Sequence, residues 1–346
     1  MRILEINQVN FGSTGHIMLQ IADLARAEGH KAVCCYYARR NRNKDKNTIY
    51  IGNKITHNIH KRFCKYTGYN GCLSLISTLN FIRKAKKFEP DIIHIHNLHN
   101  CYINLPMLFK FIKKNDIKVV WTLHDCWSFT GQCAHFVIAK CDRWKSGCHD
   151  CPQIHVYPRS NVDRTKKMWR LKKQWFTGVK EMTIVTPSVW LSDLVKESYL
   201  KDYPVMVINN GIDLSVFKRT ASDFRAKNNL VGKFIILGVA SIWETRKGID
   251  VFIELAKRLD ERFRIVLVGT DDEIDNALPD NIISIHRTSN QIELAEIYSA
   301  SDIFFNPTRE DTYPTVNMEA IACGTPVMTF NTGGSPEIPL LNFFDI

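Results

Sequence analysis

The sequence contains no run of apolar residues long enough to cross a membrane. A transmembrane helix needs roughly 18 or more consecutive apolar residues, and no stretch of the 346 residues meets that requirement. The N-terminus lacks the apolar core of an export signal, and the chain has no low-complexity tract or short repeat. These absences argue against membrane-spanning, secreted and fibrous proteins, and they lead us to expect a cytoplasmic protein.

The composition that is present, 45% hydrophobic and 23% charged, is typical of a globular protein. Because the chain is longer than one typical core, we expect two domains. Ten of the eleven cysteines precede residue 152. In a chain without an export signal they are expected to be reduced thiols, and a metal site is one use for them.

Charge is distributed unevenly between the two halves. Residues 1–200 carry 32 Lys and Arg against 14 Asp and Glu, whereas residues 201–346 carry 14 against 21. An anionic partner of the basic half would explain this asymmetry, and nucleic acid and an anionic membrane leaflet are both candidates. Solvated lysine faces in a basic proteome would explain it equally well.

Short apolar runs alternate with longer amphipathic segments, a pattern typical of parallel-sheet α/β units. The first series of predicted strands is Arg2–Gln8, Lys31–Ala38, Asp91–Asn97, Lys118–His124 and Met182–Pro187. The second series is Phe234–Ala240, Arg264–Gly269, Ile282–His286, Asp302–Asn306 and Pro326–Phe330, with helices at Ile249–Leu259, Gln291–Ala300 and Pro314–Cys323. The first helix opens in the loop 12–15, with Ile17, Ile21, Leu24 and Ala25 on one face.

The segment Val205–Phe217 separates the two series, so we predict domains at 1–204 and 205–346. Ligands of open α/β sheets bind at the carboxyl ends of the strands. Function is therefore expected in the loops that follow strands, around a cleft that two facing domains would share.

The sharpest local signal is the segment 306–320, in which a predicted strand leads through an acidic loop into a helix. Pro314 suits the first turn of that helix, and the free N–H groups of a helix start favour anionic or hydroxyl-rich ligands. Glu319 follows Asp311 by eight positions, so the two could contact different parts of one elongated ligand. A capped helix with a buried Glu319 is the structural alternative.

A second signal follows the predicted strand Phe234–Ala240. Arg246 and Lys247 stand next to each other before Gly248, between a strand and a helix. A guanidinium fork beside an ammonium point charge can clamp a diphosphate. Taken alone, the pair could equally be solvated.

Five motifs in this order resemble the family 4 glycosyltransferases. They are Asn210–Asp213, Arg246–Gly248, the Asp311 and Glu319 pair, Cys323–Val327 and Gly333–Glu337. The resemblance implies a GT-B fold, with two Rossmann-like parallel-sheet domains facing a cleft. It also implies transfer of a sugar from a nucleotide diphosphate sugar, with retention of anomeric configuration and without a metal, as in bacterial surface-polysaccharide biosynthesis.

The same resemblance implies a role for each matched donor-side residue. Arg246 and Lys247 would neutralise the departing diphosphate, because fixed cations stabilise a leaving anion. Glu319 would hold the ribose. Asp311, Thr312 and Tyr313 would contact the donor sugar and phosphates. The family usually has Glu where this chain has Asp311, and the adjacent Glu310 leaves open which carboxylate contacts the sugar.

In the first half, His124 ends a predicted strand and matches the family's histidine that faces the donor sugar. Its implied role is polar contact and orientation, not general base catalysis. Gly15 is the expected donor-side contact of the first loop, because glycine permits close backbone approach to a ligand. His94, His96 and His99 are spaced like metal ligands, but placement near the cleft is the preferred interpretation.

A cysteine-rich insert near 126–152 holds Cys133, Cys141, Cys148 and Cys151. The last two form the close pair of a four-cysteine zinc site, whereas the others are unusually widely spaced. A structural zinc, unliganded buried thiols and a redox pair therefore remain open. No cofactor is expected for catalysis.

Basic and aromatic residues alternate in Lys61–Tyr69, Arg83–Phe88 and Arg164–Phe176. The last suits a helix lying on anionic lipid. An acceptor carried on a polyprenyl diphosphate, at the inner face of the plasma membrane, would explain a basic acceptor domain, and a soluble glycan is the other acceptor considered. We do not expect a nucleic-acid partner.

Rival interpretations are a GT-B enzyme of other chemistry, such as a nucleotide-sugar epimerase or a phosphorylase, and a nucleic-acid-binding protein with a zinc module. The second leaves the motifs around Arg246, Asp311 and Glu319 unexplained. Family members usually continue well beyond the Gly333–Glu337 motif, whereas this sequence stops nine residues after it. An incomplete second domain, with weakened activity, is therefore also expected.

Overall fold

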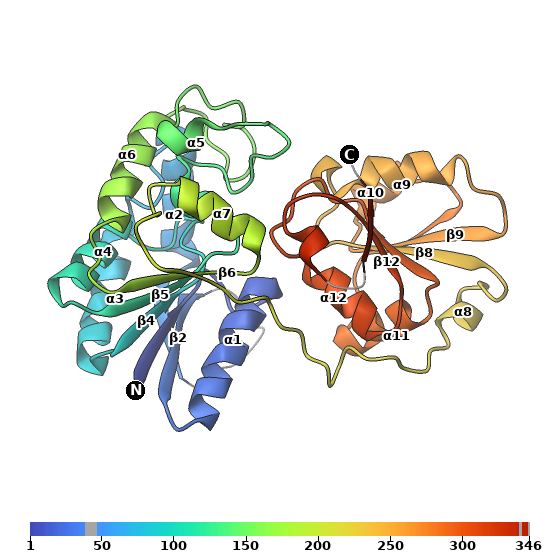
Figure 1. The fold of residues 1–346 in the computed structure, drawn as a ribbon, viewed down its shortest axis with the longest axis horizontal. Helices are drawn as coiled ribbons and strands as arrows, with labels where there is room; N and C mark the ends of the chain where they lie inside the picture. The colour runs from blue at the N-terminus through green and yellow to red at the C-terminus, as the bar shows by residue number, and fades with distance from the viewer. Residues whose placement is uncertain (39–46, 339–340, 345–346) are drawn as a thin grey trace. The chain divides into compact units, whose positions relative to one another are not determined.

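The computed structural model describes residues 1–38, 47–338 and 341–344, and it divides the chain into two compact units (Figure 1). The first unit is Met1–Asn209 and the second is Asn210–Ile346. The division falls five residues later than predicted, because Val205–Val207 forms an edge strand of the first sheet instead of opening the second domain.

The first unit is built on a parallel sheet of seven strands in the order β3-β2-β1-β4-β5-β6-β7. The strands are β1 (Arg2–Ile6), β2 (Lys31–Ala38), β3 (Thr48–Asn53), β4 (Ile92–Ile95), β5 (Lys118–Thr122), β6 (Met182–Thr186) and β7 (Val205–Val207). The helices are α1 (Gly12–Ala27), α2 (Lys54–Thr67), α3 (Leu75–Phe88), α4 (Leu105–Lys114), α5 (Arg143–Ser146), α6 (Thr165–Phe176) and α7 (Val189–Glu197), with a short 3-10 helix, η1 (Trp127–Phe129).

The second unit has a parallel sheet of six strands in the order β10-β9-β8-β11-β12-β13. The strands are β8 (Phe234–Val239), β9 (Phe263–Val268), β10 (Ile282–Ile285), β11 (Ile303–Asn306), β12 (Val327–Phe330) and β13 (Leu341–Phe344). The helices are α8 (Phe224–Lys227), α9 (Ile249–Ala256), α10 (Asp272–Asp275), α11 (Gln291–Ser299) and α12 (Thr315–Ala322), with 3-10 helices η2 (Thr245–Lys247) and η3 (Ser335–Glu337).

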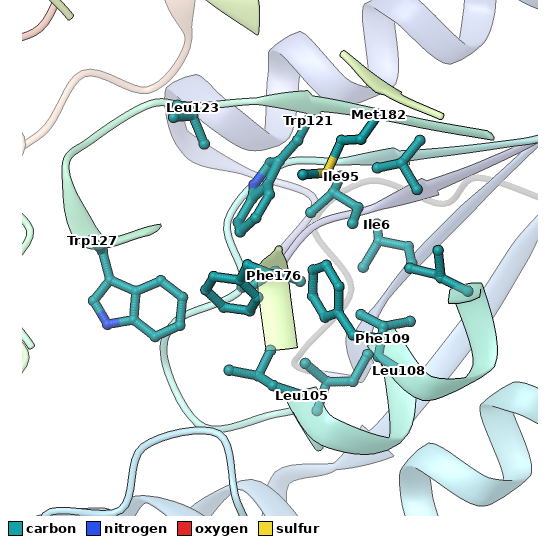
Figure 2. Close-up of a cluster of buried hydrophobic side chains, with 14 of the residues drawn as sticks. Ile6, Ile95, Leu105, Leu108, Phe109, Trp121, Leu123, Trp127, Phe176 and Met182 are labelled. Carbon is teal, nitrogen blue, oxygen red and sulfur yellow. The ribbon is translucent and has the colours of Figure 1, made fainter. Parts of the chain in front are cut away.

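Both sheets bury their two faces, which is why their strands read as continuous apolar runs. In β2, Cys34 and Tyr36 contribute to one core cluster with α1, whereas Cys35 and Tyr37 contribute to another. Figure 2 shows the larger cluster, where Phe109 of α4 and Phe176 of α6 pack against Trp121 of β5. The Phe109 and Phe176 ring centroids lie 4.7 Å apart. This packing fixes the strands whose ends carry the site.

Local sequence signals explain where several helices begin. The Asn53 side chain accepts hydrogen bonds from the backbone N–H groups of Ile55 and Thr56 at the start of α2, and Asn104 caps α4 in the same way. The first N–H groups of a helix have no acceptor within the helix, and such caps supply one. Pro314 is the N-cap of α12 and does not lie in its first turn as predicted.

Two predicted helix faces are wrong. Helix α1 begins at Gly12 itself and buries Gly15, Met18 and Ala22, whereas Leu24 is 67% exposed. Helix α6 buries Met168, Trp169 and Phe176, so its apolar face belongs to the protein core and is not available to lipid. In both helices the neighbouring elements decide which face is buried, and the number of apolar residues on a face does not.

The strands β3 and β13 were not predicted. Strand β3 lies at the edge of the first sheet, paired only with β2, and β13 pairs with β12. The C-terminal apolar run was expected to lack a partner, and Leu341–Phe344 of it forms β13; residues 339–340 and 345–346 of that run lie outside the described part of the chain. None of the helices in the described residues has the length and apolar character needed to cross a bilayer.

Candidate active site

Strand order reverses between β1 and β4 in the first unit and between β8 and β11 in the second. Loops diverge at such a switch point, and ligands bind there at the carboxyl ends of the strands. Each unit therefore offers one candidate half-site, and most of the predicted residues lie in these two places.

The first half-site is organised by a buried carboxylate in the sheet. Glu5 of β1 is 0% exposed and lies beside β4 in register with His94. Its carboxylate oxygens lie 3.0 Å from Nδ1 of His94 and 3.1 Å from Nε2 of His96. His94 also contacts the Thr122 hydroxyl at 2.8 Å. A charge in a sheet core needs such partners, because an unpaired buried carboxylate is costly.

The network continues from Glu5 to the predicted donor-side histidine. Nδ1 of His96 lies 3.0 Å from Nε2 of His124, and the two rings stack at a centroid distance of 5.3 Å. Burial and the neighbouring histidines lower the pKa of His124 to about 3, and burial lowers that of His96 to about 4. Both imidazoles are therefore neutral at physiological pH.

Neutral rings and an ionised Glu5 fix the direction of these hydrogen bonds. Burial opposes ionisation of Glu5, but attraction and hydrogen bonds from His94 and His96 outweigh it and lower its pKa to about 2. The carboxylate can only accept, so His96 donates from Nε2 and presents an unprotonated Nδ1. His124 must then donate from Nε2, which leaves its own Nδ1 as an acceptor nitrogen. Glu5 therefore selects the tautomer of His124 through His96.

A pair formed by His99 and Asp125 adjoins this network. Nε2 of His99 contacts the Asp125 carboxylate at 2.9 Å, and Nδ1 of His99 lies 3.0 Å from the Tyr157 hydroxyl. Burial opposes ionisation of Asp125, but attraction to His99 outweighs it and lowers its pKa to about 2. Tyr157 lies just beyond the cysteine-rich insert, in the stretch that leads to α6, and this stretch contacts the loop that follows β4.

Gly15 lies in α1, where the space for a side chain is filled. A Cβ at Gly15 would come within 2.7 Å of the Asn10 carbonyl carbon. The absence of a side chain is therefore required by the packing of α1 on the loop after β1. Contact of Gly15 with a donor stays a prediction.

The second half-site brings together the loops after β8 and β11. The backbone N–H of Arg309 donates to the Arg246 carbonyl at 2.9 Å. Gly248 has a φ of +79°, and a Cβ there would lie 2.4 Å from the Pro307 carbonyl oxygen. Glycine is needed at this position because both the left-handed backbone and the close loop contact exclude a side chain.

The predicted cations and acidic residues meet between these loops. Nζ of Lys247 lies 2.6 Å from the Asp311 carboxylate, and both side chains are largely buried, at 19% and 18% exposure. The Arg246 guanidinium donates to the Glu310 carbonyl at 3.2 Å and to the Glu244 carboxylate at 2.9 Å. Of the two neighbouring acidic residues, Asp311 is the one whose carboxylate pairs with Lys247.

The two glycines of the Gly333–Glu337 motif hold the backbone of Asp311. Gly334 donates its N–H to the Asp311 carbonyl at 3.1 Å. Gly333 has a φ of +57°, and a Cβ there would lie only 1.9 Å from the same carbonyl oxygen. This contact explains why two glycines stand so far along the chain from the acidic loop that they support.

The other predicted donor-side residues follow Asp311. Thr312 and Tyr313 are buried, and the Tyr313 carbonyl accepts a hydrogen bond from the Asn210 side chain at 3.4 Å. Glu319 lies on α12 and accepts a hydrogen bond from the Tyr298 hydroxyl at 3.2 Å. Loss of hydration raises the pKa of Glu319 to about 7.

Sequence reasoning missed Glu5, Asp125 and Tyr157. A signal for Glu5 was present, because a lone acidic residue in the apolar strand Arg2–Ile6 has to find a buried partner. Nothing in the sequence pointed to Tyr157, which contacts a residue 58 positions earlier.

Two Rossmann-like parallel-sheet units in one chain, with half-sites at their switch points, define the GT-B class of fold. The sucrose-phosphate synthase of Thermosynechococcus elongatus shares it with a TM-score of 0.69, at 17% identity, covering 96% of this chain and 82% of that one. Anabaena HepE in complex with UDP and glucose gives a TM-score of 0.66, at 14% identity, covering 97% of this chain and 82% of that one.

The chain belongs to Glycosyltransferase Family 4, whose model matches residues 14–216, while residues 233–340 match the model of the glycosyl transferases group 1. The putative colanic acid biosynthesis glycosyl transferase WcaC of Escherichia coli (strain K12) is 27% identical over 256 residues, or 72% of this chain. The matched region spans 62% of the length of that relative.

The buried Glu5 network generates a stability prediction. Glu5→Gln removes the charge that the two histidines stabilise, and we expect it to lower the free energy of unfolding by about 1–3 kcal/mol at pH 7. Because the folded-state pKa is depressed from 4.5 to about 2, this difference is fully present above pH 4.5 and disappears as the pH falls towards 2. Urea denaturation followed by tryptophan fluorescence measures it.

Glu89→Gln is the matched control for this change, since Glu89 is in the same unit but its side chain is 72% exposed. We expect that variant to differ from the wild type by less than about 1 kcal/mol. If both variants are equally stable at pH 7, Glu5 does not hold the histidine network as a charge.

Proposed function

We propose that this chain is a glycosyltransferase that moves a sugar from a nucleotide diphosphate sugar to a glycan or lipid-linked glycan acceptor. The observation that carries the proposal is the pairing of Lys247 with Asp311 beside Arg246, at the carboxyl ends of β8 and β11. Solved structures of HepE hold UDP and UDP-glucose, and WcaC is named for colanic acid biosynthesis, which supports a nucleotide-sugar donor and a glycan product.

The charges of this half-site suit the departure of the diphosphate from the sugar. As the bond between sugar and diphosphate breaks, negative charge grows on the leaving phosphate. Lys247 and Arg246 are held by Asp311 and by the Glu310 carbonyl, so they are in place before the reaction starts. Preorganised cations stabilise such an anion without needing to reorganise, and this is the role we assign to them instead of a metal ion.

His124 is proposed to orient the donor sugar. With a pKa near 3 it is a poor proton acceptor at neutral pH, which argues against general base catalysis. Its Nδ1 acceptor, set by Glu5 and His96, suits a hydrogen bond from a sugar hydroxyl. Reaction without a protein base is consistent with the retention expected of the family, and NMR of the product anomer tests it: an inverted product would exclude retention.

The donor site is tested by calorimetric titration of the protein with UDP, GDP and ADP. We expect one nucleotide to bind selectively, and Lys247→Ala to weaken that binding by about 30-fold or more, the equivalent of about 2 kcal/mol for a lost charge contact to phosphate. Lys257→Ala is the control, because Lys257 lies in the same unit and pairs with Glu254 at the surface. Equal binding by both variants, or none by a folded wild type, contradicts the proposed donor site.

The raised pKa of Glu319 predicts pH-dependent nucleotide binding. A ribose diol donates hydrogen bonds to a carboxylate, and a protonated carboxyl accepts them poorly. Since the pKa of Glu319 is about 7, affinity should fall as the pH is lowered from about 8 to about 6. The nucleotide phosphate also titrates in this range, and it does so equally for both proteins. Dividing the wild-type affinity by the Glu319→Gln affinity at each pH therefore cancels its effect. A ratio that stays constant over this range shows that Glu319 does not contact the ribose.

We further propose that the basic unit works at the anionic inner face of the plasma membrane. The support lies on α2 and α3, where Ile55, Ile59 and Ile76 are 69%, 56% and 76% exposed. Lys61, Arg62, Arg83 and Lys84 are exposed on the same two helices. Apolar side chains flanked by cations suit a surface that contacts anionic lipid.

Sedimentation with anionic vesicles at low salt tests this localisation. We expect the protein to be retained, and the double change Lys61→Glu and Arg62→Glu to weaken vesicle binding by about 30-fold or more, at about 1 kcal/mol per cation removed. Lys257→Glu on the second unit is the control. Failure of the wild type to bind, or equal loss in the control, excludes α2 as the contact.

A further inference from the structure

The cysteine-rich insert joins β5 to α6 and brings distant thiols to one cavity. Four cysteines line it, although they span 19 positions of the sequence: Cys133, Cys141, Cys148 and Cys151. The cavity is small, about 10 Å³, which is the space of one bound water or one ion. All four are free thiols.

We propose that Cys133, Cys141, Cys148 and Cys151 bind one structural zinc ion. Zinc in structural sites is held by four ligands in a tetrahedron, commonly four thiolates. In the described residues, no three of these four Sγ atoms lie within 4.8 Å of one another. Binding therefore has to draw the thiols closer together.

The surroundings of the cavity supply the positive charge that such a site needs. Zinc with four thiolates carries a net charge of −2. Lys172 of α6 is 0% exposed, and its ammonium donates to the carbonyls of Trp127 and Thr130, which carry no formal charge. It is near enough to Cys133 and Cys148 to interact with both. Arg143 lines the cavity itself. Protonated Lys172 and Arg143 would together offset the charge of the zinc–thiolate cluster.

A hydrogen-bond donor also faces one of the sulfurs. The backbone N–H of Gly131 points to Sγ of Cys148 at 3.1 Å, and a Cβ at Gly131 would lie 2.8 Å from the Cys148 Cβ. N–H donors of this kind stabilise thiolate ligands from the second shell of a metal site. The indole nitrogen of Trp144, which also lines the cavity, is buried without a hydrogen-bond partner among the described residues.

The other compact ligand sets of the described residues are less suited to zinc. His60, Cys64 and Cys101 lie within 4.8 Å of one another, but both ring nitrogens of His60 are already used, by the Ser74 hydroxyl at 2.8 Å and the Leu73 N–H at 3.2 Å. The Glu5, His94 and His96 set belongs to the network that reaches His124. The insert is therefore the favoured metal site.

A zinc ion here would fix the insert in place. Apart from short helices the insert is irregular, and Tyr157, just beyond it, contacts His99. Zinc would provide the cross-links that an irregular segment of this length lacks. We therefore predict that zinc orders the insert and stabilises the first unit.

The test measures the metal content of the full chain, purified without chelator and dialysed, by inductively coupled plasma mass spectrometry. We expect about one zinc per chain, and a loss of most of it in Cys141→Ser and in Cys151→Ser. These two positions are half-buried and so are the least disruptive to change. Cys72→Ser, half-buried outside the insert, and Cys64→Ser, in the rival ligand set, should retain the wild-type content.

Replacement of zinc by cobalt supplies a readout independent of stability. Four thiolates around cobalt give intense charge-transfer and tetrahedral ligand-field absorption, which each serine variant should weaken and neither control should change. A protein that binds neither metal after reduction and reconstitution overturns the proposal. So does a Cys148–Cys151 disulfide found by mass spectrometry of the alkylated native protein, or metal lost only in Cys64→Ser.

Discussion

The first unit depends on a single buried charge. Glu5 lies in the middle of an apolar strand, where an unpaired carboxylate would be strongly destabilising. The fold meets this constraint by placing His94 on the adjacent strand and His96 directly after it, both within hydrogen-bond distance. The same pairing decides how His96 is protonated, and through it which nitrogen of His124 accepts a hydrogen bond. Stability and site chemistry therefore have one origin here.

The second unit obtains its order from backbone contacts. Gly248 and Gly333 each allow a loop to approach a carbonyl oxygen at a distance that no side chain would permit. The result is that the loops bearing Lys247 and Asp311 meet with their charges 2.6 Å apart. A salt bridge at the surface would contribute little, whereas this pair is largely buried at the switch point of the sheet.

Much of the fold could be predicted because parallel strands have a distinctive pattern. Buried strands such as Phe234–Val239 are apolar on both faces, and they alternate with amphipathic helices in a regular order. Of the edge strands, β10 was predicted, but β3, β7 and β13 escaped detection. Val205–Val207 pairs on one side only and is partly exposed, so it resembles a linker. The exposed and buried faces of α1 and α6 depended on which neighbours covered them.

The sequence by itself determined the family, the order of the two units and the residues that carry charge in the second half-site, because motifs such as Arg246–Gly248 and Gly333–Glu337 are local and keep their spacing. Only the tertiary structure decided which of these residues touch. Glu5 and His96 are 91 positions apart, and Tyr157 reaches His99 from a different segment. Contacts of this kind depend on strand register and on the path of the loops. Neither can be inferred from the pattern of residues along the sequence.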